Sequence, residues 1–80
     1  MTAAADITIK SLDARGMKCP MPIVKTAQAI KTMEPGELIE VLATDPGAPA
    51  DFAAWSRSTG NSLVSNRIED GVYHFVLRRK

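Results

Sequence analysis

The chain passes from a strand into a helix within residues 12–22, which read LDARGMKCPMP. The only cysteine, Cys19, lies in this stretch, and Pro20 and Pro22 follow it. Proline is favoured at the first position of a helix, because its fixed φ suits the helix and its missing N–H is no loss there. We therefore predict a helix over residues 20–34, with Cys19 as its N-cap.

The predicted helix start favours a reactive sulfur. Because the two prolines carry no N–H, the Met21 amide is the donor that remains for a capping side chain. The sulfur of Cys19 would accept this hydrogen bond best as a thiolate, and the helix dipole favours negative charge at the same end. Arg15 and Lys18 add nearby positive charge, which raises the thiolate fraction of a cysteine. The alternative is a buried structural cysteine, since free cysteine is among the most buried residue types.

The composition indicates one small globular domain over residues 1–80, with residues 1–5 predicted to be disordered. The 80 residues are 45% apolar and carry a net charge of +1, which gives no global electrostatic argument for binding nucleic acid or a membrane surface. No apolar run is long enough for a membrane span, and the first residues lack the pattern of a signal peptide. One cysteine cannot form an internal disulfide, so we expect a reduced, cytoplasmic protein.

The apolar pattern predicts four strands and two helices. Ile7 and Ile9 alternate in the first strand, and Leu12 is out of phase with them, which indicates a bulge or the strand end before a turn at 13–18. In the first helix, the predicted buried stripe runs from Ile23 to Ile30. The predicted strands span residues 6–12, 38–43, 63–68 and 72–78, and the predicted helices span residues 20–34 and 49–59.

The order of these elements, β-α-β-α-β-β, decides the fold class. Right-handed crossovers would place both helices on one face of the sheet. The residues at 69–71, Glu-Asp-Gly, are typical of a hairpin turn that joins the last two strands. We therefore predict an α/β (α+β) two-layer sandwich, whose second sheet face is open to solvent or to a partner.

Other candidate sites have simpler structural interpretations. A Cys–His site would need His74, the only histidine, within reach of Cys19, whereas a mid-strand histidine on the open sheet face is the simpler interpretation. One cysteine and one histidine fall short of a zinc ligand set, so no metal is expected. A redox sensor or peroxidase would need an outside thiol, because no resolving cysteine is present. In an RNA-binding domain, Arg67 and the basic end Arg78-Arg79-Lys80 would contact phosphates, but the balanced net charge argues against this function.

The motif Cys19-Pro20-Met21-Pro22 resembles the Cys-Pro-x-Pro motif of the TusA/SirA family of small sulfur carriers. Residues 12–18 are similar to the family's lead-in to that cysteine, and the resemblance covers about residues 7–79. Three further segments contribute to it: Pro35-Gly36-Glu37, Ala43-Thr44-Asp45-Pro46 and Asp51-Phe52. The resemblance implies a mixed four-stranded sheet of order 1-2-4-3, in which strand 4 is antiparallel to the others.

The same resemblance implies a role in sulfur transfer. Cys19 would accept a persulfide sulfur from a cysteine desulfurase or a rhodanese-like donor and pass it to a DsrE-like or other acceptor protein, without a cofactor or metal. The pathways known for the family include transfer RNA 2-thiolation, cofactor biosynthesis and sulfur oxidation, and all three stay open here. The alternative is an RNA-binding or regulatory protein-interaction module of the same fold without sulfur chemistry. The residues expected to support the cysteine or to bind its partners are Arg15, Gly16, Lys18, Pro20, Met21 and Pro22.

Overall fold

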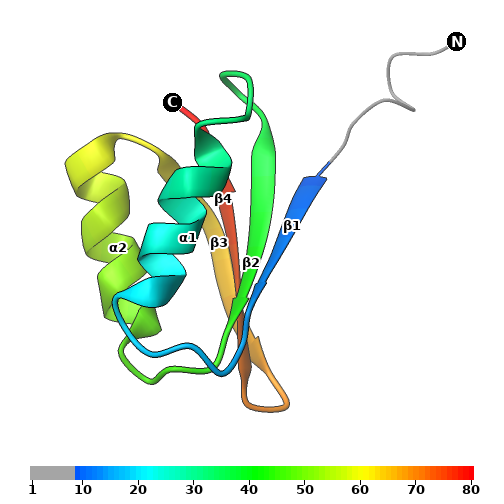
Figure 1. Ribbon diagram of the computed structural model, residues 1–80, viewed down its shortest axis with the longest axis vertical. Coiled ribbons are helices and arrows are strands. Elements are labelled where there is room, and N and C mark those ends of the chain that lie inside the picture. Colours follow the sequence, from blue (N-terminus) through cyan, green and yellow to red (C-terminus); the bar gives the residue numbers. More distant parts are fainter. Residues whose placement is uncertain (1–8) are drawn as a thin grey trace, which may run out of the picture.

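The computed structural model describes residues 9–80, and Figure 1 shows a sheet covered by two helices. The predicted order of elements is confirmed. Residues 1–5, for which we predict disorder, and the expected strand start at 6–8 lie outside the described residues. The elements are β1 (Ile9–Ala14), α1 (Met21–Ile30), β2 (Leu38–Ala43), α2 (Ala48–Thr59), β3 (Ser62–Glu69) and β4 (Val72–Arg78).

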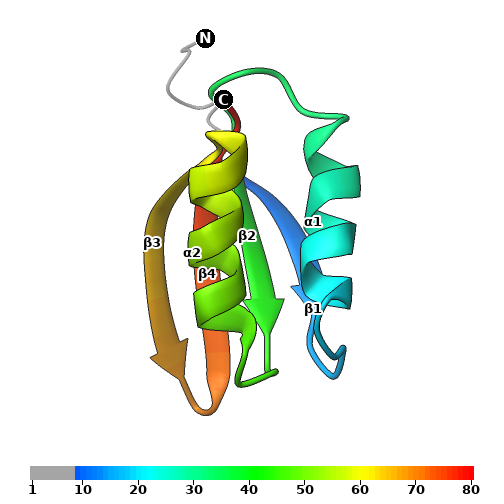
Figure 2. The ribbon, with the colours of Figure 1, turned by 90° about the vertical axis from the view of Figure 1, so that its left-hand side faces the viewer.

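The four strands form one mixed sheet in the order β1-β2-β4-β3. β1 and β2 are parallel, and β4 is antiparallel to both of its neighbours. Figures 1 and 2 show both helices on the same face of this sheet, so the two-layer sandwich predicted from the sequence is confirmed. Because β1 and β2 are parallel and each precedes a helix, the two strand-to-helix connections lie at the same end of the sheet, where both strands finish.

The core lies between the helices and the two central strands. Ile39 and Val41 of β2 and Phe75 of β4 are completely buried, and the prediction of an interior strand at 38–43 is confirmed. Phe52 of α2 is also fully buried, and its ring stacks on Phe75 at a centroid distance of 4.5 Å. Burial of one such side chain contributes about 1.5–3 kcal/mol, so this layer of aromatic and branched residues fixes α2 on the sheet.

The first strand ends later and is more regular than predicted. It pairs with β2 without interruption from Ile9, opposite Leu38, to Ala14, opposite Ala43. The expected bulge or strand end near Leu12 is therefore wrong, and the turn begins only after Ala14. The reason is which side chains of β1 face the core. Ile9 is 51% exposed, whereas Leu12 packs against the core and Ala14 is fully buried, so Leu12 is in phase with the buried side of the strand.

The first helix is shorter than the predicted span of 20–34. It ends at Ile30, and the chain then makes tight turns that bring Met33 back into the core. Its buried residues are Pro22, Thr26 and Ile30, which are four apart. The predicted stripe is confirmed at Ile30, whereas Ile23 is only half-buried against the core. The Thr26 hydroxyl donates to the Pro22 carbonyl at 2.8 Å, which satisfies this polar group inside the core.

The second half of the chain follows the sequence pattern closely. α2 ends at Thr59, and Gly60 follows it as the C-cap with a φ of 83°, the left-handed conformation expected of a glycine at a helix end. The hairpin turn uses Asp70 and Gly71 with φ of 51° and 79°, as a two-residue type I′ turn requires. The register between β3 and β4 shifts between Leu63 and Ser65. Within residues 9–80, no helix is long and apolar enough to cross a membrane.

Candidate functional site

Cys19 lies in the connection between β1 and α1, and its side chain is exposed. The helix begins one residue later than predicted: Pro20 is the N-cap and Met21 is the first helical residue. The Met21 amide donates to the Lys18 carbonyl at 2.9 Å, so it closes a tight turn. The prediction that Cys19 caps the helix and accepts the Met21 N–H is therefore wrong, because the backbone uses that donor itself.

The sulfur has a different partner, which comes from the second helix. The Cys19 thiol donates to Oδ2 of Asp51, with Sγ and Oδ2 2.5 Å apart. Asp51 is half-buried in the first turn of α2, where a carboxylate is favoured by the helix dipole. The parallel pairing of β1 and β2 explains this contact, because it brings the starts of both helices to one edge of the molecule.

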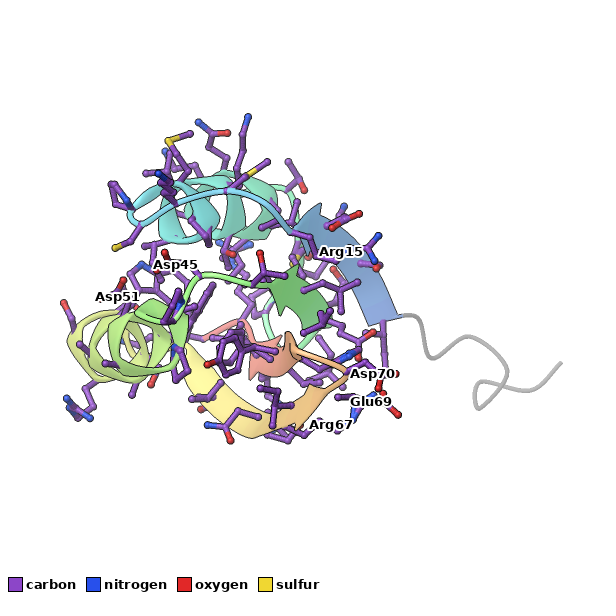
Figure 3. The ribbon with its side chains drawn as sticks, turned by 90° about the horizontal axis from the view of Figure 1, so that it is seen from below. Arg15, Asp45, Asp51, Arg67, Glu69 and Asp70 are labelled. Carbon is purple, nitrogen blue, oxygen red and sulfur yellow. The ribbon has the colours of Figure 1, made fainter. Side chains whose placement is uncertain are left out.

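A second carboxylate lies beside Asp51. Asp45, in the connection between β2 and α2, accepts a hydrogen bond from the Gly47 amide at 3.0 Å. A Cβ placed on Gly47 would lie 3.0 Å from Oδ2 of Asp45 and 3.8 Å from Oδ2 of Asp51, so both carboxylates border the N-cap of α2. Figure 3 shows Asp45 and Asp51 together on one side of the molecule, with Arg15 well away from them.

These carboxylates reverse the expected electrostatics of the cysteine. The hydrogen bond to Asp51 raises the pKa of the Cys19 thiol above its ordinary value, and partial desolvation and the charges of Asp51 and Asp45 act in the same direction. Negative charge next to a thiol disfavours the thiolate. The neighbours of the sulfur therefore do not stabilise a thiolate in the way the predicted helix start would.

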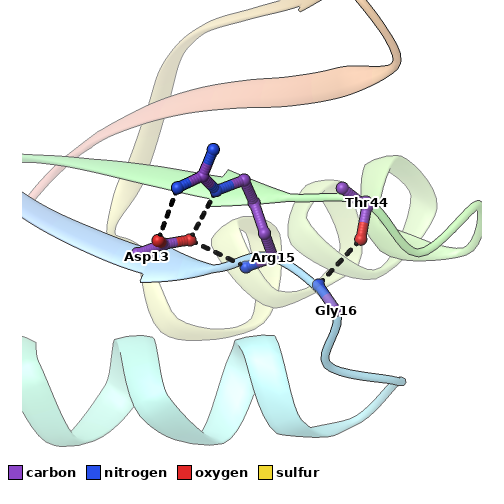
Figure 4. A network of polar contacts seen from close by, with 4 residues as sticks. All are labelled: Asp13, Arg15, Gly16 and Thr44. Carbon is purple, nitrogen blue, oxygen red and sulfur yellow. Dashed lines mark hydrogen bonds and ion pairs between the residues drawn. The ribbon is translucent and has the colours of Figure 1, made fainter.

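Arg15 and Gly16 hold the loop that carries Cys19. The Arg15 guanidinium forms a two-point ion pair with Asp13, with nitrogen–oxygen distances of 2.9 and 2.8 Å (Figure 4). This pairing lowers the pKa of Asp13 to about 2. Gly16 adopts a φ of 79°, and its amide donates to the Thr44 hydroxyl at 2.9 Å. Arg15 is thus engaged with Asp13 and not with the sulfur, while Gly16 ties the end of β1 to the end of β2.

The other residues of the predicted site divide between support and surface. Pro22 is buried and begins the inner face of α1, so it anchors the helix directly after the cysteine. Pro20 and Lys18 are exposed beside Cys19. Met21 is 41% exposed on the same short stretch, which leaves apolar surface next to the sulfur. Contacts of Lys18 and Met21 with a partner stay a prediction.

His74 belongs to the open face of the sheet. Its Nδ1 is 3.6 Å from Glu40 and its Nε2 is 3.7 Å from Glu69, while Nδ1 is buried without a hydrogen bond. These carboxylates, and not Cys19, are its charged neighbours, so the structure gives no support to a Cys–His pair. Among residues 9–80, no cluster of three histidine, cysteine or acidic side chains is arranged to hold a metal ion.

The basic end of the chain is part of the packing. The Arg79 guanidinium donates to the Met33 carbonyl, and the Arg79 amide donates to the Glu37 carbonyl at 2.9 Å. The Lys80 amide donates to Asn61 at 2.8 Å. Arg67 is 3.8 Å from Glu69. The two Arg79 contacts hold the turn between α1 and β2, so Arg79, which the RNA-binding alternative would place on a phosphate, is engaged within the fold.

Asp51 is the neighbour of Cys19 that sequence reasoning missed. In the sequence it appears only as an acidic residue in the first turn of the second helix and as part of the family resemblance. Its approach to Cys19, 32 positions away in the chain, depends on the parallel pairing of β1 and β2. Parallel pairing of the first two strands places the two helix starts side by side, so this strand order was the signal that could have brought Asp51 next to Cys19.

Comparison with protein families and known proteins gives a consistent result. The family model described as sulfurtransferase TusA matches residues 10–79. The sulfur carrier protein TusA of Allochromatium vinosum is 39% identical over 70 residues, a match that covers 88% of this chain and 92% of that protein. A protein of Halobacterium salinarum is 46% identical, and that match covers both chains completely.

A solved structure shows the same fold. The crystal structure of the SirA-like protein from Desulfitobacterium hafniense superposes with a TM-score of 0.76, covers 89% of this chain and 96% of that one, and is 22% identical in sequence. At that identity the similarity supports the architecture, including the mixed sheet of order β1-β2-β4-β3 under two helices.

Proposed function

The chain belongs to the TusA family of sulfurtransferases and sulfur carriers, and we propose that it carries its sulfur as a persulfide on Cys19. The observation that carries this proposal is the position of Cys19: it is a free, exposed cysteine in the loop that precedes α1. A lone thiol without a resolving cysteine suits a group that is loaded and then handed on.

The proposed loading step moves one sulfur atom without net oxidation or reduction. The Cys19 thiolate gives an electron pair to the outer sulfur of a donor persulfide. The S–S bond of the donor breaks, and its electron pair stays on the donor sulfur, which takes up the proton that Cys19 has lost. Unloading is the same displacement in reverse order: an acceptor thiolate attacks the outer sulfur of the Cys19 persulfide, and Cys19 leaves as a thiolate.

The surroundings of Cys19 support a carrier that docks against other proteins. The loop is held by the Gly16–Thr44 hydrogen bond and by the buried Pro22, so the sulfur is presented on a fixed support. Met21 and Val24 of α1 are 41% and 37% exposed and offer apolar surface beside it. We propose a cysteine desulfurase or a rhodanese-like protein as the donor and a DsrE-like or other thiol protein as the acceptor, in a reducing cytoplasm.

Intact-mass spectrometry tests the proposal. The purified chain is incubated with a cysteine desulfurase and cysteine, and we expect a gain of one sulfur atom that a reducing agent removes. The Cys19→Ser variant should gain nothing. A sulfur gain that persists in this variant, or no gain with either a desulfurase or a rhodanese-type donor, would refute the proposal. Arg67→Gln, on the far strand β3, is the matched control and should load like the wild type.

A further inference from the structure

The hydrogen bond between Asp51 and Cys19 suggests in which protonation state the cysteine is held before it is loaded with sulfur. We propose that Asp51 is a positioning residue that holds the Cys19 thiol in its protonated form, aimed at the start of α2, until a sulfur donor docks. This inference builds on the proposed sulfur transfer and concerns the state of Cys19 before loading. Its evidence is the geometry of the two helix starts.

The contact between the two side chains is supported by both helices. Asp51 is held in the first turn of α2, where its amide donates to the Gly47 carbonyl at 3.1 Å. Phe52, the next residue, is fully buried against Phe75, which fixes the direction of this turn. On the other side, the Val24 amide donates to the Pro20 carbonyl at 3.0 Å and starts α1 directly after Cys19. Cys19 and Asp51 therefore face each other from two fixed helix ends.

The charges around this contact favour the protonated thiol. Asp51 approaches from α2, and Asp45 approaches from the connection between β2 and α2. The connection between β1 and α1 contributes Arg15 and Lys18, and α1 contributes Lys25. Arg15 is paired with Asp13, and within residues 9–80 neither Lys18 nor Lys25 forms an ion pair with either carboxylate. The raised pKa of Cys19 agrees with this arrangement.

This arrangement would make the sulfur selective for a docked donor. The thiolate is the form of cysteine that reacts with electrophiles and oxidants, so a protonated Cys19 reacts slowly with small molecules. In the loading step, the proton of Cys19 has to pass to the donor thiolate as the S–S bond breaks. A docked donor supplies that acceptor at the right place, whereas a freely diffusing electrophile does not.

The rate of alkylation by iodoacetamide as a function of pH tests the proposal without any sulfur donor. Asp51→Asn removes the charge and keeps the size of the side chain. We expect it to alkylate roughly fivefold faster than the wild type near neutral pH, with its pH profile displaced to lower pH. Asp51→Glu keeps the charge and should react at close to the wild-type rate. Asp70→Asn, in the hairpin turn on the other side of the molecule from Asp51 (Figure 3), is the matched control and should leave the profile unchanged.

A second measurement needs no variant at Asp51 and therefore does not depend on how such a variant folds. The ultraviolet absorbance of the thiolate, with Cys19→Ser as the blank, gives the titration midpoint of Cys19 in the folded chain and in urea. We expect the folded midpoint to lie at higher pH. A folded midpoint at or below the unfolded one, or an alkylation profile unchanged in Asp51→Asn, overturns the proposal for Asp51. Neither result depends on sulfur loading, which the mass measurement tests separately.

Discussion

Replacement of Phe52 by alanine should come close to unfolding this protein. Phe52 is completely buried, stacks on Phe75 at 4.5 Å and meets Trp55 edge-on at 6.4 Å. Truncation of a buried phenylalanine to alanine costs about 3–5 kcal/mol, because the lost transfer free energy adds to that of the cavity left behind. At about 0.05–0.15 kcal/mol per residue, a chain of 80 residues has a free energy of unfolding of about 4–12 kcal/mol. The loss is therefore a large share of the total.

Urea denaturation followed by circular dichroism measures this loss. Phe52→Leu fills part of the space and should cost about half as much as Phe52→Ala, so its transition stays measurable even where that of the alanine variant does not. Ile68→Ala is the control: Ile68 is 60% exposed, and its loss should change the free energy of unfolding by no more than about 0.5 kcal/mol. A cost below about 1 kcal/mol for Phe52→Ala, with an unchanged urea slope, would show that α2 is not held on the sheet by this ring.

Two further predictions concern charged side chains. Because folding lowers the pKa of Asp13 from 3.8 to about 2, the contribution of its pair with Arg15 to stability is complete above pH 3.8 and disappears as the pH falls through about 2. Carbon NMR of the Asp13 carboxyl should show this low midpoint and should show it returning toward 3.8 in Arg15→Gln; a normal midpoint in the wild type would contradict the pairing. Arg79→Met should lower the free energy of unfolding by about 1–2 kcal/mol, because the Met33 carbonyl loses its charged donor, whereas Arg67→Gln should change it by no more than about 0.5 kcal/mol. Equal melting behaviour of these two variants would show that the basic end is not part of the packing.

The fold was predictable because each local signal in the sequence agrees with the others. The run at 38–43 is nearly continuously apolar and forms a strand with neighbours on both sides. Gly60 and the Asp70-Gly71 pair occupy positions with positive φ, which their residue types allow at low cost. The strand order came from the family resemblance, and the position of both helices on one face followed from the handedness of the crossovers.

The errors concern features that depend on contacts between distant residues. The end of the first strand was predicted wrongly because Ile9 was taken as a core residue. In the structure Ile9 faces away from the core, and the register between β1 and β2 determines which side chains face inward. The first helix ends at Ile30 because Met33 is recruited to the core and its carbonyl is satisfied by Arg79.

The site shows the same limit. Sequence reasoning placed the reactive group at Cys19 but assigned it a backbone donor and nearby cations. In the structure the backbone donor is used by Lys18, the arginine is used by Asp13, and the partner of the sulfur is Asp51. Local sequence singles out the cysteine, whereas the packing of distant elements decides which groups surround its sulfur.

The register shift in β3 has a consequence for how this protein behaves in crowded solution. β3 is an edge strand of eight residues, and it exposes Val64 and Ile68 by 46% and 60%. A flat edge of this length invites strands of other molecules to add to it and so to start aggregates. The shift leaves Val64 without a partner on β4 and bends the strand, which breaks the regular row of free backbone groups. The shift therefore makes this edge a poorer template for a strand of another molecule.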